Sequence, residues 1–520
     1  MDLPILIEQL GDPKAYPEDP GSILVLQTHI SVVFLTRKWA YKLKKPVRLD
    51  FLDFSTLDLR KHFCEEEVRL NRALAPWVYE GVVPICNSES GLKMEAEGEP
   101  LEWAVKMHRL PDEATLESRI DSGEEVADVI VALAERLARF HSLAERGGRI
   151  SKTAEWETVA RNVRGNFVAS EHQPGDVISS QVYDRLLHLT EEGLSEFRAL
   201  INERAKKEIP CSCHGDLHLD HIYYFEERKS PEDLVCVDCI EFNERFRYID
   251  PIADLAFPCM DLMYHGRRDL AQLLEESYFK HAGSTEGREL LPFYAAYRAC
   301  VRAKVEGLKL VEKEVPEEEK EKARQAARAH WFLALDLFEP PLRRPALLLV
   351  GGLPGVGKTT VARMLGERAD FEVLRSDVIR KEIAGVSAQE KDAPIYSEEW
   401  NTRTYDRCLE EAQKILDQGG RVVVDGTFRE QSKRLAFWEL AKSRCLRTAF
   451  ICCTAPRPEV KRRLDERSGD YSDADWATYE LIEKNWEPLP ESENHFSLDT
   501  TRDNSDTAAL RFLQQIGLFE

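Results

Sequence analysis

The sequence predicts a multidomain protein in which an α+β region is followed by an α/β region with a parallel sheet. The chain has 520 residues, a length that accommodates about two to four domains. The first 110 residues show mostly strand patterns, and helical patterns dominate from about residue 126 to residue 336. From residue 346 onward, short apolar strands alternate with amphipathic helices, which is typical of a parallel sheet with crossover helices.

Hydrophobic periodicity predicts the elements of the first region. Residues 57–74 carry apolar side chains at helical spacing and predict one helix among the strands, and residues 127–145 predict a long amphipathic helix. A loop-rich stretch at 211–225 precedes a predicted strand at 234–242. Residues 312–330 carry Glu–Lys pairs four apart and predict a solvated helix.

A proline-rich segment indicates the domain boundary. Residues 338–345, FEPPLRRP, end the preceding helical pattern and are typical of a linker. We therefore expect a first domain over residues 1–337 and a second domain over residues 346–520.

Composition narrows the functional classes. The formal net charge is −22, and an acidic surface repels phosphate backbones, so nucleic acid is an unfavoured partner. The N-terminus MDLPILIEQL lacks a basic segment and does not resemble a signal peptide, and no apolar run approaches the ~18 residues of a membrane helix. We expect a cytoplasmic protein without a membrane segment, whose oligomeric state the sequence leaves open.

The twelve cysteines do not indicate a disulfide scaffold in a chain of this length. Four of them form two close pairs whose spacing would suit zinc, namely Cys211, Cys213, Cys236 and Cys239. Both pairs lie in apolar segments, which favours the simpler interpretation of buried thiols on strands that flank a site.

A phosphate-binding loop is the strongest motif. The segment from Gly352 to Thr359 fits G-x-x-x-x-G-K-[ST] in full, between an apolar strand and an amphipathic helix. Its glycines let backbone N–H groups surround phosphates, and the helix N-terminus adds its positive dipole end. We expect Lys358 to contact the β- and γ-phosphates of ATP and Thr359 to bind Mg²⁺. The expected ATP-binding residues of this loop are Gly352, Gly355, Gly357, Lys358, Thr359 and Thr360.

Polar residues follow two further strands of the second region. Asp425 closes the strand at 422–424, where it can hold Mg²⁺ beside the phosphate loop; a turn Asp before a glycine is the alternative. Asp377 can take a proton from an attacking hydroxyl, and Arg380, one turn later, can bind a substrate phosphate. A helix-capping Asp with a surface Arg is the alternative for that pair.

The stretch 429–467 is rich in basic residues and contains candidate lid residues that would close on the transferred phosphate. Arg463 and Arg467 are the principal candidates, and Arg457 and Arg462 are further ones. A solvated helix face is the alternative for most of them.

The segments LVGGLPGVGKTTVA, SDVIRK and VVVDGTF resemble those of small-substrate P-loop kinases, including gluconate-kinase-like, zeta-toxin-like and polynucleotide-kinase-like proteins. The resemblance covers roughly residues 345–518. In polynucleotide-kinase relatives the S-D-x-x-R element supplies a base and a substrate-binding Arg. The resemblance therefore implies these roles for Asp377 and Arg380 and leaves the substrate open.

A second series of motifs lies in the first region. The segment HGDLH at 214–218 precedes the strand that ends CIEF at 239–242, and IDPIADLA follows at 249–256. This series resembles the aminoglycoside phosphotransferase family, which has a protein-kinase-like fold, over about residues 20–335. The resemblance implies that Asp216 is the catalytic Asp, which orients a substrate hydroxyl and takes its proton.

The same resemblance implies that Lys42 and Glu67 form the ion pair that grips ATP phosphates. Lys44 and Glu66 are the near alternatives. No clear glycine-rich loop precedes Lys42, in departure from the family.

The metal ligands also depart from the family pattern. The metal-binding Asn of that pattern falls at His221, and the metal-binding Asp falls at Glu241, with Asp238 shortly before it. Mg²⁺ prefers oxygen ligands over imidazole. The alternatives are therefore that Mn²⁺ is used, that Glu241 and Asp238 carry the metal, or that this domain is slow or catalytically silent.

The order of the two regions resembles bacterial proteins that fuse an aminoglycoside-phosphotransferase-like part to an AAA-type P-loop ATP-binding part, over nearly the whole chain. We therefore expect an ATP- and Mg²⁺-dependent kinase that acts on a small-molecule hydroxyl. One alternative is an ATP-driven switch with a pseudokinase N-terminal domain. A nucleic-acid end kinase is the other; the basic stretch at 429–467 favours it and the net charge opposes it.

Overall fold

The computed structural model describes residues 3–49, 51–89, 91–312, 315–386, 395, 397–466, 474–490, 494–502 and 504–520. The chain divides into two compact units. Unit 1 comprises Met1–Asn162 and Glu196–Ala295, and unit 2 comprises Val163–Ser195 and Ala296–Glu520. Among the described residues, no helix has the length and apolar character needed to cross a membrane.

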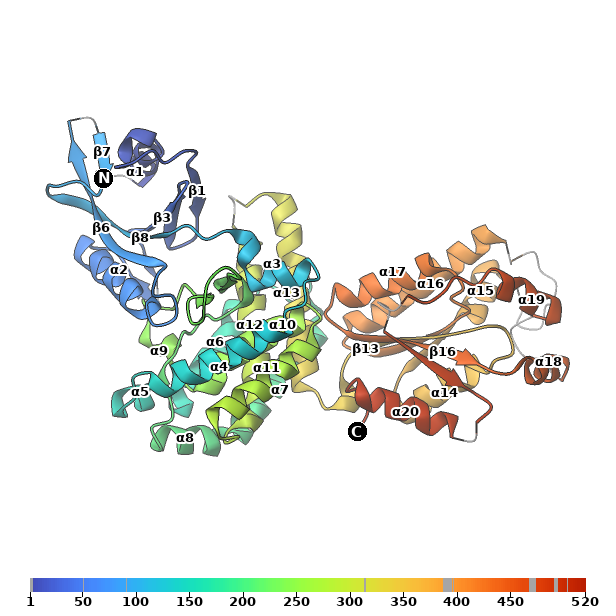
Figure 1. Ribbon diagram of the computed structural model, residues 1–520. Helices are drawn as coiled ribbons and strands as arrows, with labels where there is room; N and C mark the ends of the chain where they lie inside the picture. The colour runs from blue at the N-terminus through green and yellow to red at the C-terminus, as the bar shows by residue number, and fades with distance from the viewer. Residues whose placement is uncertain are drawn as a thin grey trace. The chain divides into compact units, whose positions relative to one another are not determined.

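Unit 1 begins with a six-stranded antiparallel sheet (Figure 1). In spatial order its strands are β1 (Leu24–Gln27), β2 (Ser31–Leu35), β3 (Trp39–Lys44), β8 (Pro100–His108), β6 (Tyr79–Ser88) and β7 (Gly91–Met94). Tyr41 and Leu43 of β3 join a hydrophobic core with the helix α1 (Leu3–Leu10). Because side chains alternate along a strand, Lys42 and Lys44 face the other side. The helix α2 (Leu57–Asn71) packs against β8.

The rest of unit 1 is mainly helical. The amphipathic helix α4 (Ala127–Leu143) packs against α11 (Arg268–Ala282), and α10 (Pro251–Tyr264) is almost wholly buried. Two short antiparallel pairs of strands include parts of the loop-rich stretch at 211–225. They are β9 (Cys211–Ser212) with β12 (Tyr248–Ile249), and β10 (Ile222–Tyr224) with β11 (Leu234–Cys236). The other helices wholly in this unit are α3 (Leu116–Asp121), α5 (Gly148–Thr153), α8 (Arg198–Lys206) and α9 (Glu244–Arg247).

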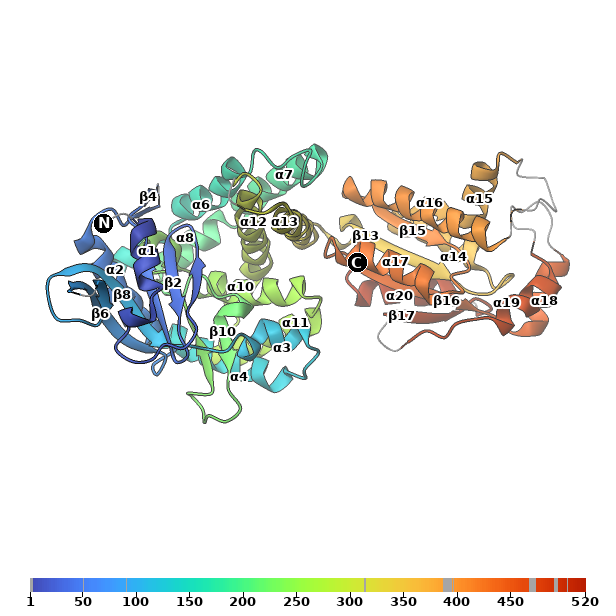
Figure 2. The same cartoon turned by 90° about the horizontal axis from the view of Figure 1, so that it is seen from above.

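Unit 2 contains a five-stranded parallel sheet with helices on both faces (Figures 1 and 2). Its strand order is β14 (Glu372–Arg375), β15 (Arg421–Asp425), β13 (Ala346–Gly351), β16 (Arg447–Thr454) and β17 (His495–Asp499). Helices α14 (Lys358–Ala369) and α20 (Ser505–Gln515) lie on one face, and α16 (Glu398–Asp417) and α17 (Gln431–Lys442) lie on the other. Every residue of the central strand β13 is buried, as expected for a parallel strand covered on both faces. Three shorter helices complete this part: α15 (Ser376–Ala384), α18 (Arg457–Asp465) and α19 (Trp476–Lys484).

Helices that precede the sheet in sequence also belong largely to unit 2. They are α7 (Ser180–Glu196), α12 (Leu291–Lys309) and α13 (Glu317–Phe338). The carboxylate of Asp336 on α13 accepts two hydrogen bonds from Arg447 at the start of β16, at 2.7 and 3.1 Å. Arg185 on α7 donates to the backbone oxygen of Gly419 at 3.1 Å. These contacts attach α13 and α7 to the parallel sheet; helix α6 (Trp156–Ala169) runs from unit 1 into unit 2.

Candidate active sites

The phosphate-binding loop of unit 2 connects the end of β13 to the start of α14. Gly352 has φ of +136°, and a Cβ atom at this position would lie 2.5 Å from the backbone oxygen of Cys453. Only glycine fits there without displacing β16. The ammonium of Lys358 donates to the backbone oxygen of Leu353 at 2.9 Å, so it lies across the loop where phosphate oxygens would be bound.

Asp425 lies at the carboxyl end of β15, beside this loop. Its register partner on β13 is Val350, and its Oδ2 accepts a hydrogen bond from the Thr359 hydroxyl at 2.6 Å. Burial raises the pKa of Asp425, although Lys358 and Thr359 act in the opposite direction. A buried carboxylate and a hydroxyl together supply oxygen ligands of the kind that Mg²⁺ prefers, so these two residues fit the ion.

A cavity of about 670 Å³ extends from the loop to the first residues of α15. Lys358, Thr359, Asp425, Asp377 and Arg380 all line it. Arg380 is buried and donates to the backbone oxygen of Ile395 at 3.2 Å and to Asn401 Oδ1 at 3.1 Å. The alternative of a surface Arg therefore does not describe this residue.

The cavity also has lining residues that the sequence reasoning did not select. Among them are residues from the loop before α17, from α17 itself and from the start of α19, namely Arg429, Glu430, Lys433, Asp475 and Thr478. Their motif signal is weak, because single polar or charged residues in two segments about 40 residues apart form no local pattern. The basic stretch at 429–467 did include three of them, Arg429, Glu430 and Lys433.

The candidate lid arginines have different surroundings. Arg463 on α18 donates to Thr500 Oγ1 at 3.0 Å, and the Thr500 hydroxyl donates to the Val356 backbone oxygen in the phosphate loop at 2.6 Å. Arg462 pairs with Glu459 on an exposed helix face, and Arg457 pairs with glutamates of α19. The solvated-face alternative describes Arg462. Arg467 lies outside the described residues.

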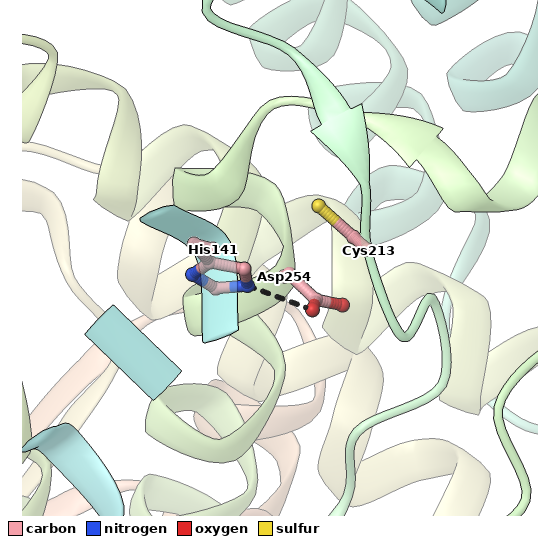
Figure 3. A group of neighbouring side chains, drawn as sticks. All are labelled: His141, Cys213 and Asp254. Carbon is pink, nitrogen blue, oxygen red and sulfur yellow. Dashed lines mark hydrogen bonds and ion pairs between the residues drawn. The ribbon is translucent and has the colours of Figure 1, made fainter. Parts of the chain in front are cut away.

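In unit 1, Asp254 supports the loop that carries Asp216. The Asp254 carboxylate on α10 accepts hydrogen bonds from the backbone N–H groups of His214 and Gly215, at 3.0 and 2.8 Å. It also contacts His141 Nε2 on α4 at 3.1 Å, a bond drawn in Figure 3. Burial alone would raise the pKa of Asp254, but these bonds outweigh it and lower the pKa to about 2. The loop is thus held by an ionised carboxylate.

The four clustered cysteines are all buried thiols. Cys211 Sγ lies 3.5 Å from Cys213 Sγ, and Cys213 lies beside His141 and Asp254 (Figure 3). Among the described residues, Cys213 is the only one of the four within a group that has metal-ligand spacing. This arrangement favours the simpler interpretation of thiols that flank a site.

Two lysines of β3 share one glutamate. The ammonium groups of Lys42 and Lys44 lie 3.0 and 2.7 Å from the two carboxylate oxygens of Glu67 on α2. Burial alone would lower the pKa of Lys42, but the carboxylates of Asp238 and Glu67 raise it well above its usual value. Glu66, the alternative partner, pairs instead with Arg69 at 2.7 Å on the surface of α2.

The candidate metal ligands of unit 1 face different groups. Glu241 is buried and forms an ion pair with Lys44, whereas Asp238 pairs with Lys42. His221 Nδ1 lies 2.9 Å from the backbone oxygen of Asp216, and His221 Nε2 lies 3.9 Å from Asp238 Oδ2. The structure therefore brings His221 together with Asp216 and Asp238, and places Glu241 toward Lys44. The strand β11 ends at Cys236 and not at residue 242 as expected, so Asp238 lies two residues beyond a strand end that the sequence did not indicate.

Comparison with known proteins gives the class of each region. Residues 59–293 match the model of the phosphotransferase enzyme family, and residues 347–489 match the model of an AAA domain. An uncharacterized protein of Mycobacterium tuberculosis is 33% identical over 470 residues, which is 89% of this chain and 90% of that protein. The chain therefore belongs to the family of that protein, and in this chain an aminoglycoside-phosphotransferase-like region precedes a P-loop ATP-binding region. The expected fold class and fusion are confirmed.

Shorter similarities concern single regions. A cytidylate kinase of Methanocaldococcus jannaschii is 29% identical over 141 residues, which is 26% of this chain and 72% of that protein. The structure of the GDP complex of aminoglycoside 2′-phosphotransferase-IIIa matches with 14% identity and a TM-score of 0.38, over 62% of this chain and 98% of that chain.

Proposed function

We propose that the protein is an ATP-dependent kinase that transfers the γ-phosphoryl group to the hydroxyl of a small molecule, and that the cavity of unit 2 is its principal active site. The main support is that residues suited to the nucleotide, Lys358 and Thr359, line the same cavity as Asp377 and Arg380, which are suited to an acceptor. A volume of about 670 Å³ is in the range of small-molecule sites.

In this proposal each side chain has one task. Lys358 leaves the Leu353 backbone oxygen and contacts the β- and γ-phosphates, while Thr359 and Asp425 hold Mg²⁺. The ion, when bound, neutralises charge on the phosphates. Asp377 accepts the proton of the acceptor hydroxyl, and Arg380 orients the acceptor from its buried position. Arg463 and Arg467 remain proposed lid residues.

The site of unit 1 is proposed as a second phosphotransferase centre. Asp216 would take the proton of a hydroxyl, and the Lys42–Glu67 pair would hold ATP phosphates. Lys44 reinforces that pair from the other oxygen of Glu67. Residues 1–337 and 346–520, joined by 338–345, are the proposed functional halves. The cytoplasm is the proposed compartment, where ATP is abundant and the twelve free thiols stay reduced.

The test is ADP release by the full chain with Mg²⁺, with and without a panel of sugars, nucleoside monophosphates and aminoglycosides. Lys358→Ala and Asp377→Asn probe unit 2, and Asp216→Asn probes unit 1. Lys442→Ala and Asp406→Asn, at exposed positions of α17 and α16, are matched controls. We expect one acceptor class to raise turnover, and Asp377→Asn to lower acceptor-dependent turnover by about 10²-fold or more.

The outcomes separate the competing functions. Turnover that no acceptor raises, and that depends on Lys358 but not on Asp377, would contradict the kinase proposal and favour an ATP-driven switch. Turnover that survives Lys358→Ala but not Asp216→Asn would place the reaction in unit 1 instead.

A further inference from the structure

The orientation of the His221 ring is fixed by a backbone carbonyl. A carbonyl oxygen only accepts hydrogen bonds, so Nδ1 of His221 must carry the proton that it donates to the Asp216 oxygen at 2.9 Å. In the neutral ring, Nε2 is then the nitrogen with the lone pair. Metal-binding histidines commonly have this arrangement, in which one nitrogen donates to a carbonyl and the other is directed at the ion.

Asp238 presents a carboxylate oxygen to that nitrogen. Its Oδ1 contacts Lys42, and its Oδ2 lies 3.9 Å from His221 Nε2. This separation exceeds a hydrogen bond but fits two ligands of one ion, since two bonds of about 2.1 Å span at most about 4.2 Å. Asp238 has φ of +64°, a conformation that costs about 1 kcal/mol or more outside glycine. Its N–H donates to the Tyr79 hydroxyl at 3.1 Å, which holds this conformation.

A second imidazole lies against the first. The rings of His218 and His221 have centroids 3.8 Å apart, and His218 Nε2 lies 3.5 Å from Asp216 Oδ2. Asp216, His218 and His221 can each offer one ligand atom, and these atoms lie within 4.8 Å of one another. The neighbourhood thus combines carboxylates with imidazoles, whereas a Mg²⁺ site is built from oxygen alone.

We propose that the site of unit 1 binds a divalent first-row transition-metal ion, with His221 and Asp238 as ligands and with Asp216 and His218 beside them. His221 is then a specificity-determining residue, because imidazole binds such ions far better than it binds Mg²⁺. The residues at this site therefore do not suit Mg²⁺, which is the ion that Thr359 and Asp425 of unit 2 are suited to bind. This metal site rests on the proposed second phosphotransferase centre of unit 1. Metal binding is measured without turnover, so the metal site and the phosphotransferase activity can each be disproved separately.

The experiment titrates metal-free full-length protein with Co²⁺, whose visible absorption reports nitrogen ligation, and separately with Mg²⁺ by calorimetry. The parent protein and all variants carry Asp425→Asn, so that metal binding at the site of unit 2 contributes equally to every titration. His221→Asn replaces the imidazole by an amide oxygen donor. His281→Asn, at an exposed position on α11, is the matched control. Thermal melting and circular dichroism confirm that each variant is folded.

We expect His221→Asn to weaken Co²⁺ binding at least about 10-fold and to reduce the intensity of its visible bands, while Mg²⁺ binds as well or better. Asp238→Asn should also weaken Co²⁺ binding; Asn tolerates the left-handed conformation, so the backbone is preserved. His281→Asn should leave both titrations unchanged. Equal Co²⁺ affinity in the parent and in His221→Asn would overturn the proposal, and so would a parent protein that binds Mg²⁺ more tightly than Co²⁺.

Discussion

Lys44 is the most consequential buried charge in unit 1, and its removal tests the reasoning about the site. Its side chain is 1% exposed and lies between the carboxylates of Glu67 and Glu241. The substitution Lys44→Met keeps an unbranched chain of similar length and removes only the charge. Both carboxylates then remain buried with one cation fewer. Removing one partner of a buried ion pair costs about 3–5 kcal/mol, and we expect a loss of that size in the free energy of unfolding of unit 1.

The loss should depend on pH in a defined direction. Burial raises the pKa of Glu241 above its usual value of 4.5 even with Lys44 present, and removing Lys44 raises it further. As the pH falls from neutral toward 4.5, the folded variant takes up this proton before the unfolded chain does. Proton uptake by the folded state stabilises it, so the difference between Lys44→Met and the parent should narrow over that window.

The assay is urea unfolding of the full chain, followed by far-UV circular dichroism at several pH values. Because the chain has two units, the transitions are fitted separately and the unit 2 transition serves as an internal reference. Lys61→Met, at a side chain 43% exposed beside Glu65, is the matched control and should cost less than about 1 kcal/mol. Adding Glu241→Gln to Lys44→Met should recover part of the loss. A loss below about 1 kcal/mol, or one that widens as the pH falls, would refute this account of the network.

Two further predictions concern the loop of Asp216 and the parallel sheet. Gly215→Ala should destabilise unit 1 by about 1–3 kcal/mol, because the added Cβ would lie 2.8 Å from the Phe246 backbone oxygen at a φ of +89°. Gly123→Ala is the control and should cost less, because Gly123 has a φ of +80° but open space around it. Thermal melting compares the two variants. Arg447→Met removes the charge partner of the fully buried Asp336 and should lower the stability of unit 2 by about 3–5 kcal/mol in calorimetry. Arg462→Met, on an exposed face, should change it by less than about 1 kcal/mol, and equal losses would contradict the reasoning.

The fold was largely predictable because it depends on local patterns. The phosphate-binding motif is a contiguous segment between a strand and a helix, and the alternation of β13 to β16 with helices was visible as hydrophobic periodicity, whereas β17 was not predicted. Asp425 was predictable for the same reason, since the carboxyl end of a neighbouring parallel strand must lie beside the loop.

The residues that the sequence left open depend on contacts between distant segments. Lys42 and Lys44 lie on the same side of β3. The sequence could not show that the single carboxylate of Glu67, on a different helix, contacts both of them. The choice between Glu241 and Asp238 depends on a left-handed backbone at Asp238 that no residue pattern reveals. Arg380 was equally suited to surface and cavity, because its burial comes from Ile395 and Asn401 in later segments. The roles of all these residues stay predictions.

The ion pair between Asp336 and Arg447 matters for any attempt to divide the protein. The proline-rich segment 338–345 is an obvious place to cut an expression fragment, yet Asp336 lies before it and Arg447 after it. Neither unit is a single stretch of sequence, since unit 2 also includes Val163–Ser195. A fragment that begins at residue 346 would carry the whole phosphate-binding motif but expose the surface that α7 and α13 cover. Poor solubility or weak activity of such a fragment would therefore reflect the place of the cut, and the intact chain is the proper material for assigning activity to either half.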